Sequence, residues 1–161
     1  MATAAELFGA DLRLLGDLEH QGDRDRGRDL FVTKRAVTAA AQSDPFDLET
    51  IDGRDNLQQA LLLRFLTRRG ELAILGHPDY GSRLYELIGE LNGQAQRNRA
   101  KLYTLEALDG EPRVAKVLSV TATQNAADRT RVDIAVSLLA IDAPTPLNFV
   151  FAVFTGGAVG P

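Results

Sequence analysis

The sequence predicts an α+β domain in which about three helices pack on a small, mainly antiparallel sheet. Between Asp55 and Leu108, apolar residues recur at the three- and four-residue spacing of helices. In the last third of the chain, apolar and polar residues alternate with the period of two that a half-buried strand requires. We expect the C-terminal strands to form the sheet together with an N-terminal hairpin or arm.

The length of 161 residues is typical of one domain with one hydrophobic core. We expect residues 1–27 to form an N-terminal arm or edge segment and residues 28–155 to form the single α+β domain. Residues 156–161 are expected to form a flexible tail. Within the arm and its continuation, the alternating charges from Asp23 to Asp29 nearly cancel, which is typical of a solvated loop.

Two short segments before the helical region have the composition of strands. They are Leu30–Thr33 and Ala36–Thr38, and Pro45 with its polar neighbours interrupts regular structure until Ile51. This pattern predicts a hairpin or an extended lead-in.

The first helix is predicted from Asp55 to Arg69. Asp55 and Gln58 resemble a capping box, and Gly70 suits the position after the helix. The apolar stripe at helical spacing indicates a core-facing helix, and it consists of Leu57, Ala60, Leu61 and Phe65, widened by Leu62, Leu63 and Leu66.

Two further helices are predicted after a glycine-bracketed turn at residues 76–81. Ser82 can cap the second helix, whose apolar face is Leu84, Leu87, Ile88 and Leu91. Asn92-Gly93 ends it. The third helix is predicted from about Gln94 to Leu108, with Leu102, Leu105 and Leu108 on a common face.

Three strands are predicted in the last third of the chain. Residues 131–138 alternate strictly, residues 114–121 form a less regular partner, and the turn at 125–128 predicts an antiparallel hairpin. The third strand, Leu147–Phe154, is apolar on both faces. Such a strand should be covered on both faces, by the chain's own helices or by another protein.

The triplet Glu111-Pro112-Arg113 lies where the third helix gives way to the first of these strands. Proline disfavours the helical conformation in the residue before it, so the helix should stop near Gly110. On near-extended backbone, Glu111 and Arg113 point to the same side and can present opposite charges to one partner. The simpler interpretation is a helix stop whose charges are solvated or pair with neighbours.

Composition excludes several classes of function. The formal net charge of −4 and the pI near 5.2 argue against a nucleic-acid partner. The chain has no cysteine, which excludes disulfides, thiolate nucleophiles and sulfur-ligated zinc. Met1–Leu15 lacks the features of a secretory leader, and no run approaches the ~20 apolar residues that cross a bilayer. We therefore expect a cytoplasmic protein without a membrane partner.

Catalytic and cofactor motifs are absent from the sequence. His20 and His77 have no metal-ligand spacing, and neither a phosphate-binding loop nor a G-x-S-x-G motif occurs. No cofactor or metal is expected. Paired carboxylates stay open as an enzymatic alternative because a glycosidase needs two acids ~5 to 9.5 Å apart. The candidates are Glu86, Glu90 and Glu106, but nothing singles them out, and solvated helix surface is the better explanation.

The succession DNLQQALLLRFLTRRGELAILGHPDYGSRLYELIGE, a helix, EPRV, a strand pair and PLNFVF resembles the baseplate wedge family of contractile phage tails. The family includes the corresponding subunits of type VI secretion and of extracellular contractile injection systems. The resemblance covers about Asp55 to Phe154. Glu111, Pro112 and Arg113 match its EPR motif. The chain departs from the pattern in the longer, more charged segment 23–52 and in Phe151-Ala152, which replaces a proline-containing ending.

This resemblance implies a structural subunit and not an enzyme. Glu111, Pro112 and Arg113 would bind the helical core bundle of the wedge. The strand residues that would add a strand of the first sheath ring by β-augmentation are Leu147, Asn148, Phe149, Val150, Phe151 and Phe154. The implied partners are wedge proteins, the first-ring sheath protein and hub, spike or tube-initiator proteins, with several copies around a symmetric particle. The protein would assemble in the cytoplasm and then belong to the particle.

Two other functions stay open from the sequence. The family was long labelled as lysozyme, so a peptidoglycan hydrolase using Glu86, Glu90 or Glu106 is one alternative. A distant branch of the same fold resembles a stress anti-adaptor, so a regulatory module that binds a response regulator is the other.

Overall fold

The computed structural model describes residues 8–16, 30–34 and 46–156. The chain divides into two compact units, Met1–Gln59 and Ala60–Pro161. The boundary falls within the first long helix, α2 (Gly53–Leu66). The predicted strand at 36–38 and most of the predicted arm and tail lie outside the described residues.

The N-terminal unit contains two pairs of short antiparallel strands. β1 (Ala10–Leu12) pairs with β4 (Thr50–Asp52), and β2 (Val32–Lys34) pairs with β3 (Phe46–Leu48). The first turns of α2 are tied to β1 and the residues beside it by side-chain amides. Asn56 Nδ2 donates to the carbonyl of Phe8 at 2.8 Å, and Gln59 Oε1 accepts from the backbone N–H of Leu14 at 2.8 Å. These amides satisfy backbone groups that have no strand partner.

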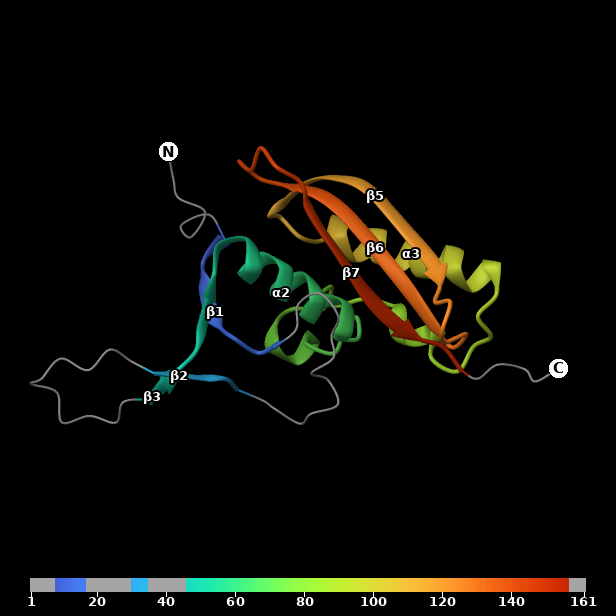
Figure 1. Cartoon of the computed structure of the whole chain (residues 1–161), viewed down its shortest axis with the longest axis horizontal. Coiled ribbons are helices and arrows are strands. Elements are labelled where there is room, and N and C mark those ends of the chain that lie inside the picture. The colour runs from blue at the N-terminus through green and yellow to red at the C-terminus, as the bar shows by residue number, and fades with distance from the viewer. Residues whose placement is uncertain (1–7, 17–29, 35–45, 157–161) are drawn as a thin grey trace, which may run out of the picture. The chain divides into compact units, whose positions relative to one another are not determined.

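The larger unit contains a three-stranded antiparallel sheet in the order β5-β6-β7. The strands are β5 (Val114–Gln124), β6 (Arg131–Ala140) and β7 (Leu147–Phe154), and α3 (Gln94–Asp109) packs on one face, mainly against β5 (Figure 1). The prediction that the N-terminal strands join this sheet is wrong. In the described part of the chain, they form their own pairs.

The core lies between the sheet and the helices. Every second residue of β6 is buried, which confirms the predicted alternation. Phe65 of α2 stacks on Phe151 of β7 with ring centroids 4.5 Å apart and lies 6.3 Å from Phe149. Stacked aromatic pairs of this kind combine large area burial with a geometric preference. The third predicted strand therefore packs on the predicted first helix.

The prediction of a second α-helix is wrong. Residues 84–91 form only a short 3-10 helix, η3 (Leu84–Leu87), because the chain is extended at Ile88 and takes positive φ values at Gly81 and Gly89. Leu84 and Leu87 are buried as predicted, but Ile88 and Leu91 are exposed. The segment before η3 includes a second 3-10 helix, η2 (Ala73–Leu75). Within the described residues, the α-helices longer than one turn are α2 and α3.

The third helix forms as predicted, but its buried face differs. Leu102 is half exposed, and Leu105 is only partly buried. The buried positions follow a spacing of three, one, three and one, and they are Ala100, Tyr103, Thr104, Ala107 and Leu108. Small residues on this face let α3 approach the sheet closely.

Gly81 lies where neighbouring backbone atoms leave no room for a side chain. Arg68 and Ser82 form a parallel bridge that closes the loop between them. A Cβ at Gly81 would lie 2.7 Å from the carbonyl oxygen of Arg68, and its φ of +104° is a conformation that other residues rarely adopt. Glycine is therefore required at this closure.

Candidate functional site

The chain turns from α3 into β5 at the triplet Glu111-Pro112-Arg113. The backbone N–H of Glu111 donates to the carbonyl of Leu108 at 3.1 Å, and the N–H of Val114 donates to the carbonyl of Glu111 at 3.0 Å. These two bonds form a tight turn that directs the side chain of Glu111 inward. The helix ends at Asp109, one residue before the predicted stop.

Glu111 is buried and binds two arginines. Its Oε2 accepts from Arg64 Nη2 at 3.2 Å, and its Oε1 accepts from Arg113 Nε at 2.6 Å. The side chains of Glu111 and Arg64 are 5% and 9% exposed, whereas that of Arg113 is 27% exposed. We call Arg64, Tyr80, Glu111 and Arg113 the Glu111 cluster. Its charged residues lie on α2 and in the turn before β5.

Arg64 is the most confined member of the cluster. Its guanidinium carbon lies 4.5 Å from the centroid of the Tyr80 ring, a cation–π distance. A Cβ at Gly110 would lie 3.2 Å from Arg64 Nη1, so a larger residue at this position would crowd the guanidinium. Arg64 Nε is buried, and it has no hydrogen-bond partner among the described residues.

The electrostatics keep Glu111 ionised. Burial alone would raise the pKa of Glu111, but the hydrogen bond and charge of Arg113, together with the charge of Arg64, lower it below the ordinary value. The pKa of Tyr80 is raised, first by burial and then by the charge of Glu111, against the opposing effect of Arg64. At neutral pH the cluster therefore holds one carboxylate, two guanidinium groups and one neutral phenol.

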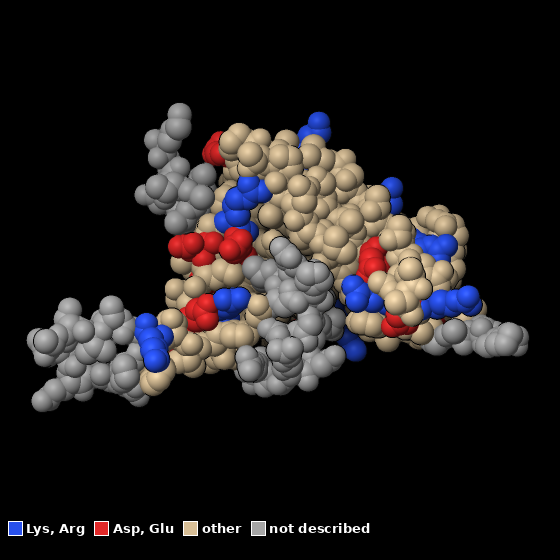
Figure 2. Space-filling view, in the orientation of Figure 1, with Lys and Arg blue, Asp and Glu red and all other residues tan. Residues whose placement is uncertain are grey.

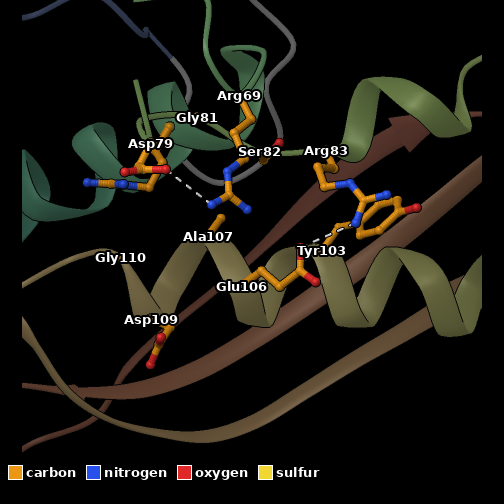
Figure 3. A pocket seen from close by; sticks show the side chains of 11 residues that line it. Arg69, Asp79, Gly81, Ser82, Arg83, Tyr103, Glu106, Ala107, Asp109 and Gly110 are labelled. Atoms are coloured by element: carbon orange, nitrogen blue, oxygen red, sulfur yellow. Dashed lines mark hydrogen bonds and ion pairs between the residues drawn. The ribbon is translucent and has the colours of Figure 1, made fainter. Parts of the chain in front are cut away.

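A hollow of about 150 Å³ adjoins this cluster (Figure 3). Arg69 extends into it and forms an ion pair of 3.4 Å with Asp79, and Arg83 contributes a second guanidinium from the other side. Asp109 points away from the hollow in Figure 3. Arginines and carboxylates line it in equal number, so its charge is mixed.

The carboxylates considered for catalysis are held by arginines. Glu86 accepts from Arg83 Nε at 2.9 Å and from the Tyr103 hydroxyl at 2.9 Å. These hydrogen bonds, that of Arg83 first, lower the pKa of Glu86. Glu90 pairs with Arg99, and Glu106 lies 3.9 Å from Arg83. A general acid needs a raised pKa, which is the opposite of the shift at Glu86.

The strand residues predicted to bind a partner lie in β7. Leu147, Phe149 and Phe151 are buried, and the rings of Phe149 and Phe151 pack near Phe65 of α2. On the other face Asn148, Val150 and Phe154 are exposed, whereas Ala152 is buried. The chain itself covers one face of β7, so coverage of the other face by another protein stays a prediction. Figure 2 shows that the central part of the exposed sheet face carries no charged residue. The register explains this, because its middle rows are Ser119–Ser137–Asn148 and Thr121–Ala135–Val150.

The two edges of the sheet differ. β7 has a continuous register with β6 and no charged residue, and within the described residues no strand pairs with its other edge. β5 has two register irregularities, at Val114/Lys116 and Val117/Ser119, and carries the exposed Lys116. Bulges and lysines are features that discourage pairing at an edge. Only β7 has the properties of an edge open to a further strand.

The histidines do not form a site. His77 is exposed in the loop after η2, and His20 lies outside the described residues. Among the described residues there is no group of three His, Cys, Asp or Glu residues that could hold a metal ion. In the same residues, no helix is long and apolar enough to cross a membrane.

Sequence reasoning missed Arg64 and Tyr80. The signal for Arg64 was present, because it lies three residues after Leu61 and seven after Leu57, on the predicted buried stripe of α2. A charge at such a position is almost never fully buried unless it is paired. Tyr80 gave no such signal, since it lies in a turn.

Comparisons with known proteins support the fold. No protein-family model and no curated protein matches the chain. Among solved structures, the chain resembles a Geobacter sulfurreducens protein that is provisionally named a tail lysozyme. The two share 23% sequence identity and superpose with a TM-score of 0.55, over 65% of this chain and 93% of the other. A likeness at this identity concerns the fold alone.

Proposed function

We propose that this chain is a structural subunit of a contractile phage tail or of a related injection machine, where it joins the baseplate to the first ring of the sheath. The observation that carries the proposal is the uncharged edge of β7, with which no described strand pairs, in a fold shared with a protein whose name contains the words tail lysozyme. The EPR triplet and the sequence resemblance support the same placement.

The backbone of β7 supports β-augmentation. The N–H of Thr155 donates to the carbonyl of Thr130 at 2.8 Å, which fixes the phase of the ladder between β7 and β6. Because hydrogen-bonded and free residues alternate along an antiparallel pair, the N–H and C=O groups of Asn148, Val150, Ala152 and Phe154 face away from β6. An added strand would bond these four residues and cover Val150 and Phe154.

The EPR triplet would provide a second contact, to the helices of the wedge. Glu111 is already buried, so the docking surface consists of the exposed Pro112 and the partly exposed Arg113. Glu111 then acts from inside by holding Arg113 in position. Wedge, sheath and hub or tube-initiator proteins are the proposed partners, in several copies around the particle, with assembly in the cytoplasm.

The proposal is tested with a pair of variants at Val150. Val150→Pro removes an N–H that β6 does not use, so the fold should persist while an added strand loses a hydrogen bond. Val150→Thr keeps the N–H and the β-branched shape, and it is the matched control. We expect the native gene cluster carrying Val150→Pro to yield few or no sheathed particles by electron microscopy, and Val150→Thr to yield normal numbers.

Two results would contradict the edge contact. One is a normal yield of full-length sheathed particles with a folded Val150→Pro protein, folding being checked by the urea unfolding of each purified variant. The other is a failure of the tagged wild-type protein to co-purify with sheath and wedge proteins. Recovery with one regulator alone would support the anti-adaptor alternative.

Hydrolysis is not part of this proposal, although the word lysozyme occurs in the name of the structural neighbour. Glu86, Glu90 and Glu106 are each paired with or close to an arginine, and the pKa of Glu86 is lowered. We expect no release of fragments from purified peptidoglycan. Release that Glu86→Gln abolishes would support the hydrolase alternative.

A further inference from the structure

Glu111 divides its two carboxylate oxygens between two arginines, and this division leaves one buried donor without an acceptor. Oε1 binds Arg113 and Oε2 binds Arg64 Nη2, while Arg64 Nε has no partner among the described residues. Nε and Nη2 lie on the same edge of a guanidinium and together match the two oxygens of one carboxylate. Glu111 therefore makes one hydrogen bond to Arg64, where the geometry of the guanidinium allows two.

We propose that Arg113 binds a carboxylate of the docking partner and that Glu111 then closes on Arg64 as a two-point pair. This inference rests on the proposed docking of the EPR triplet and specifies its chemistry. When the Arg113 side chain leaves, Oε1 keeps only the long hydrogen bond of 3.4 Å from the backbone N–H of Arg113, and it becomes available to Arg64 Nε. The loss of one internal hydrogen bond is thus compensated by another inside the chain.

Arg113 is the member that can change partners. It is 27% exposed, and its side chain is bonded to Glu111 through Nε, so its terminal nitrogens are available to an acceptor outside. Its backbone N–H also donates to Glu111 Oε1, at 3.4 Å. Arg64 is confined, since it is 9% exposed and stacks on Tyr80. The buried arginine is fixed, and the surface arginine is exchangeable.

The charge balance selects an acidic partner. The charged groups that act on Glu111 are Arg113 and Arg64, and those that act on Tyr80 are the same two arginines and Glu111. Two cations and one anion leave an excess positive charge at the surface end of the cluster. An Asp or Glu side chain on the partner satisfies this excess with the fork geometry that arginine prefers.

The first test follows the Nε–H of Arg64 by NMR in the full-length protein. In Arg113→Ala, no competing arginine binds Oε1, so the Arg64 Nε–H signal should move downfield and exchange more slowly with water. Addition of the wedge core protein from the same gene cluster to the wild type should produce the same shift. An Arg64 signal that is unchanged in both samples would overturn the exchange.

The second test measures binding to that wedge protein, with its surface Asp and Glu residues replaced by Ala one at a time. We expect Arg113→Ala to weaken binding on the order of tenfold or more. One acidic replacement on the wedge should cause an equal loss, and combining it with Arg113→Ala should cause no further loss. Arg129→Ala removes an exposed arginine elsewhere and is the matched control, expected to leave binding unchanged.

The outcomes separate the two proposals. If the wild type binds the wedge but no acidic residue is coupled to Arg113, the proposed partner chemistry is wrong and the docking proposal stands. If the wild type does not bind the wedge at all, the docking proposal fails, and the NMR comparison with Arg113→Ala still decides whether Glu111 closes on Arg64.

Discussion

The larger unit contains two clusters built from the same parts in different surroundings. In the Glu111 cluster, Arg64 stacks on Tyr80 at 4.5 Å and Glu111 binds a second donor, Arg113. In the second, the Glu86 cluster (Arg83, Glu86, Tyr103 and Glu106), Arg83 stacks on Tyr103 at 4.4 Å and Glu86 binds the Tyr103 hydroxyl as its second donor. The pKa of the central glutamate is lowered in both.

Burial separates these two clusters. Arg64 and Glu111 are 9% and 5% exposed, whereas Arg83 and Glu86 are 39% and 31% exposed. An exposed pair that is broken lets water solvate both charges, so its contribution to stability is small. A buried pair that is broken leaves a charge without water or partner. Similar geometry therefore predicts an essential contact in one place and a dispensable one in the other.

The largest expected effect is that of Arg64→Met, which removes the buried cation and keeps much of its volume. We expect the free energy of unfolding to fall by about 3 to 5 kcal/mol, because Glu111 then stays buried with Arg113 alone. Arg83→Met is the matched change in the exposed cluster and should cost much less. Urea unfolding at neutral pH measures both, and equal losses would break the comparison.

The next effect concerns acid stability. The pKa of Glu111 is lower in the folded chain than the ordinary 4.5 of a glutamate. The unfolded chain therefore takes up the proton first, and the contribution of Glu111, complete above the ordinary value, is lost as the pH falls through the folded pKa. We expect the free energy of unfolding of Glu111→Gln to depend less on pH below about 4.5 than that of the wild type.

Glu86→Gln provides the control for this pH series. The pKa of Glu86 is also lowered, so the sign of the effect is the same. Because Glu86 lies at the surface, its removal should flatten the pH dependence less than Glu111→Gln does. A larger flattening with Glu86→Gln would contradict the role assigned to burial.

A smaller effect is expected for Arg113→Ala. Arg113 is partly exposed, and Glu111 keeps its contact with Arg64. The loss in the free energy of unfolding should be about 1 kcal/mol, well below that of Arg64→Met. Thermal and urea unfolding check this, and a loss as large as that of Arg64→Met would show that Arg113 is not the exchangeable member.

The smallest effect is expected for Tyr103→Phe. This change removes the hydroxyl that donates to Glu86 at 2.9 Å and keeps the ring that stacks on Arg83. The loss should be about 0.5 to 1 kcal/mol, because Glu86 keeps its two bonds to Arg83. The pKa of Glu86, measured by NMR titration, should rise. An unchanged pKa would show that the hydrogen bond from Tyr103 does not stabilise the ionised form of Glu86.

The periodic spacing of apolar residues in the sequence predicted much of the larger unit. The strict alternation at residues 131–138 and the apolar stripe of the first helix were confirmed, because one buried face leaves a regular trace in the residues. The helix predicted at residues 84–91 was wrong, because positive φ at two glycines outweighed an apolar face of adequate spacing. On the third helix, Ala100 and Ala107 were overlooked, since small residues carry little hydrophobic signal.

The Glu111 cluster shows where sequence reasoning stopped. The triplet was recognised as a helix stop, and the same-side placement of Glu111 and Arg113 is consistent with the bond between them. The partner inside the chain, Arg64, is 47 residues away from Glu111 in sequence. No local pattern specifies such a pair, because it depends on how α2 meets the turn. Partner binding by the triplet and by β7 stays a prediction.

The unequal edges of the sheet have a consequence for stoichiometry. A sheet with two clean edges can grow without limit, as fibrils do. Here the bulges and Lys116 of β5 disfavour pairing in one direction, so under the proposed β-augmentation each copy would accept a single strand, at β7. Growth would then end after one addition, and the number of added strands in an assembly would equal the number of copies of this chain.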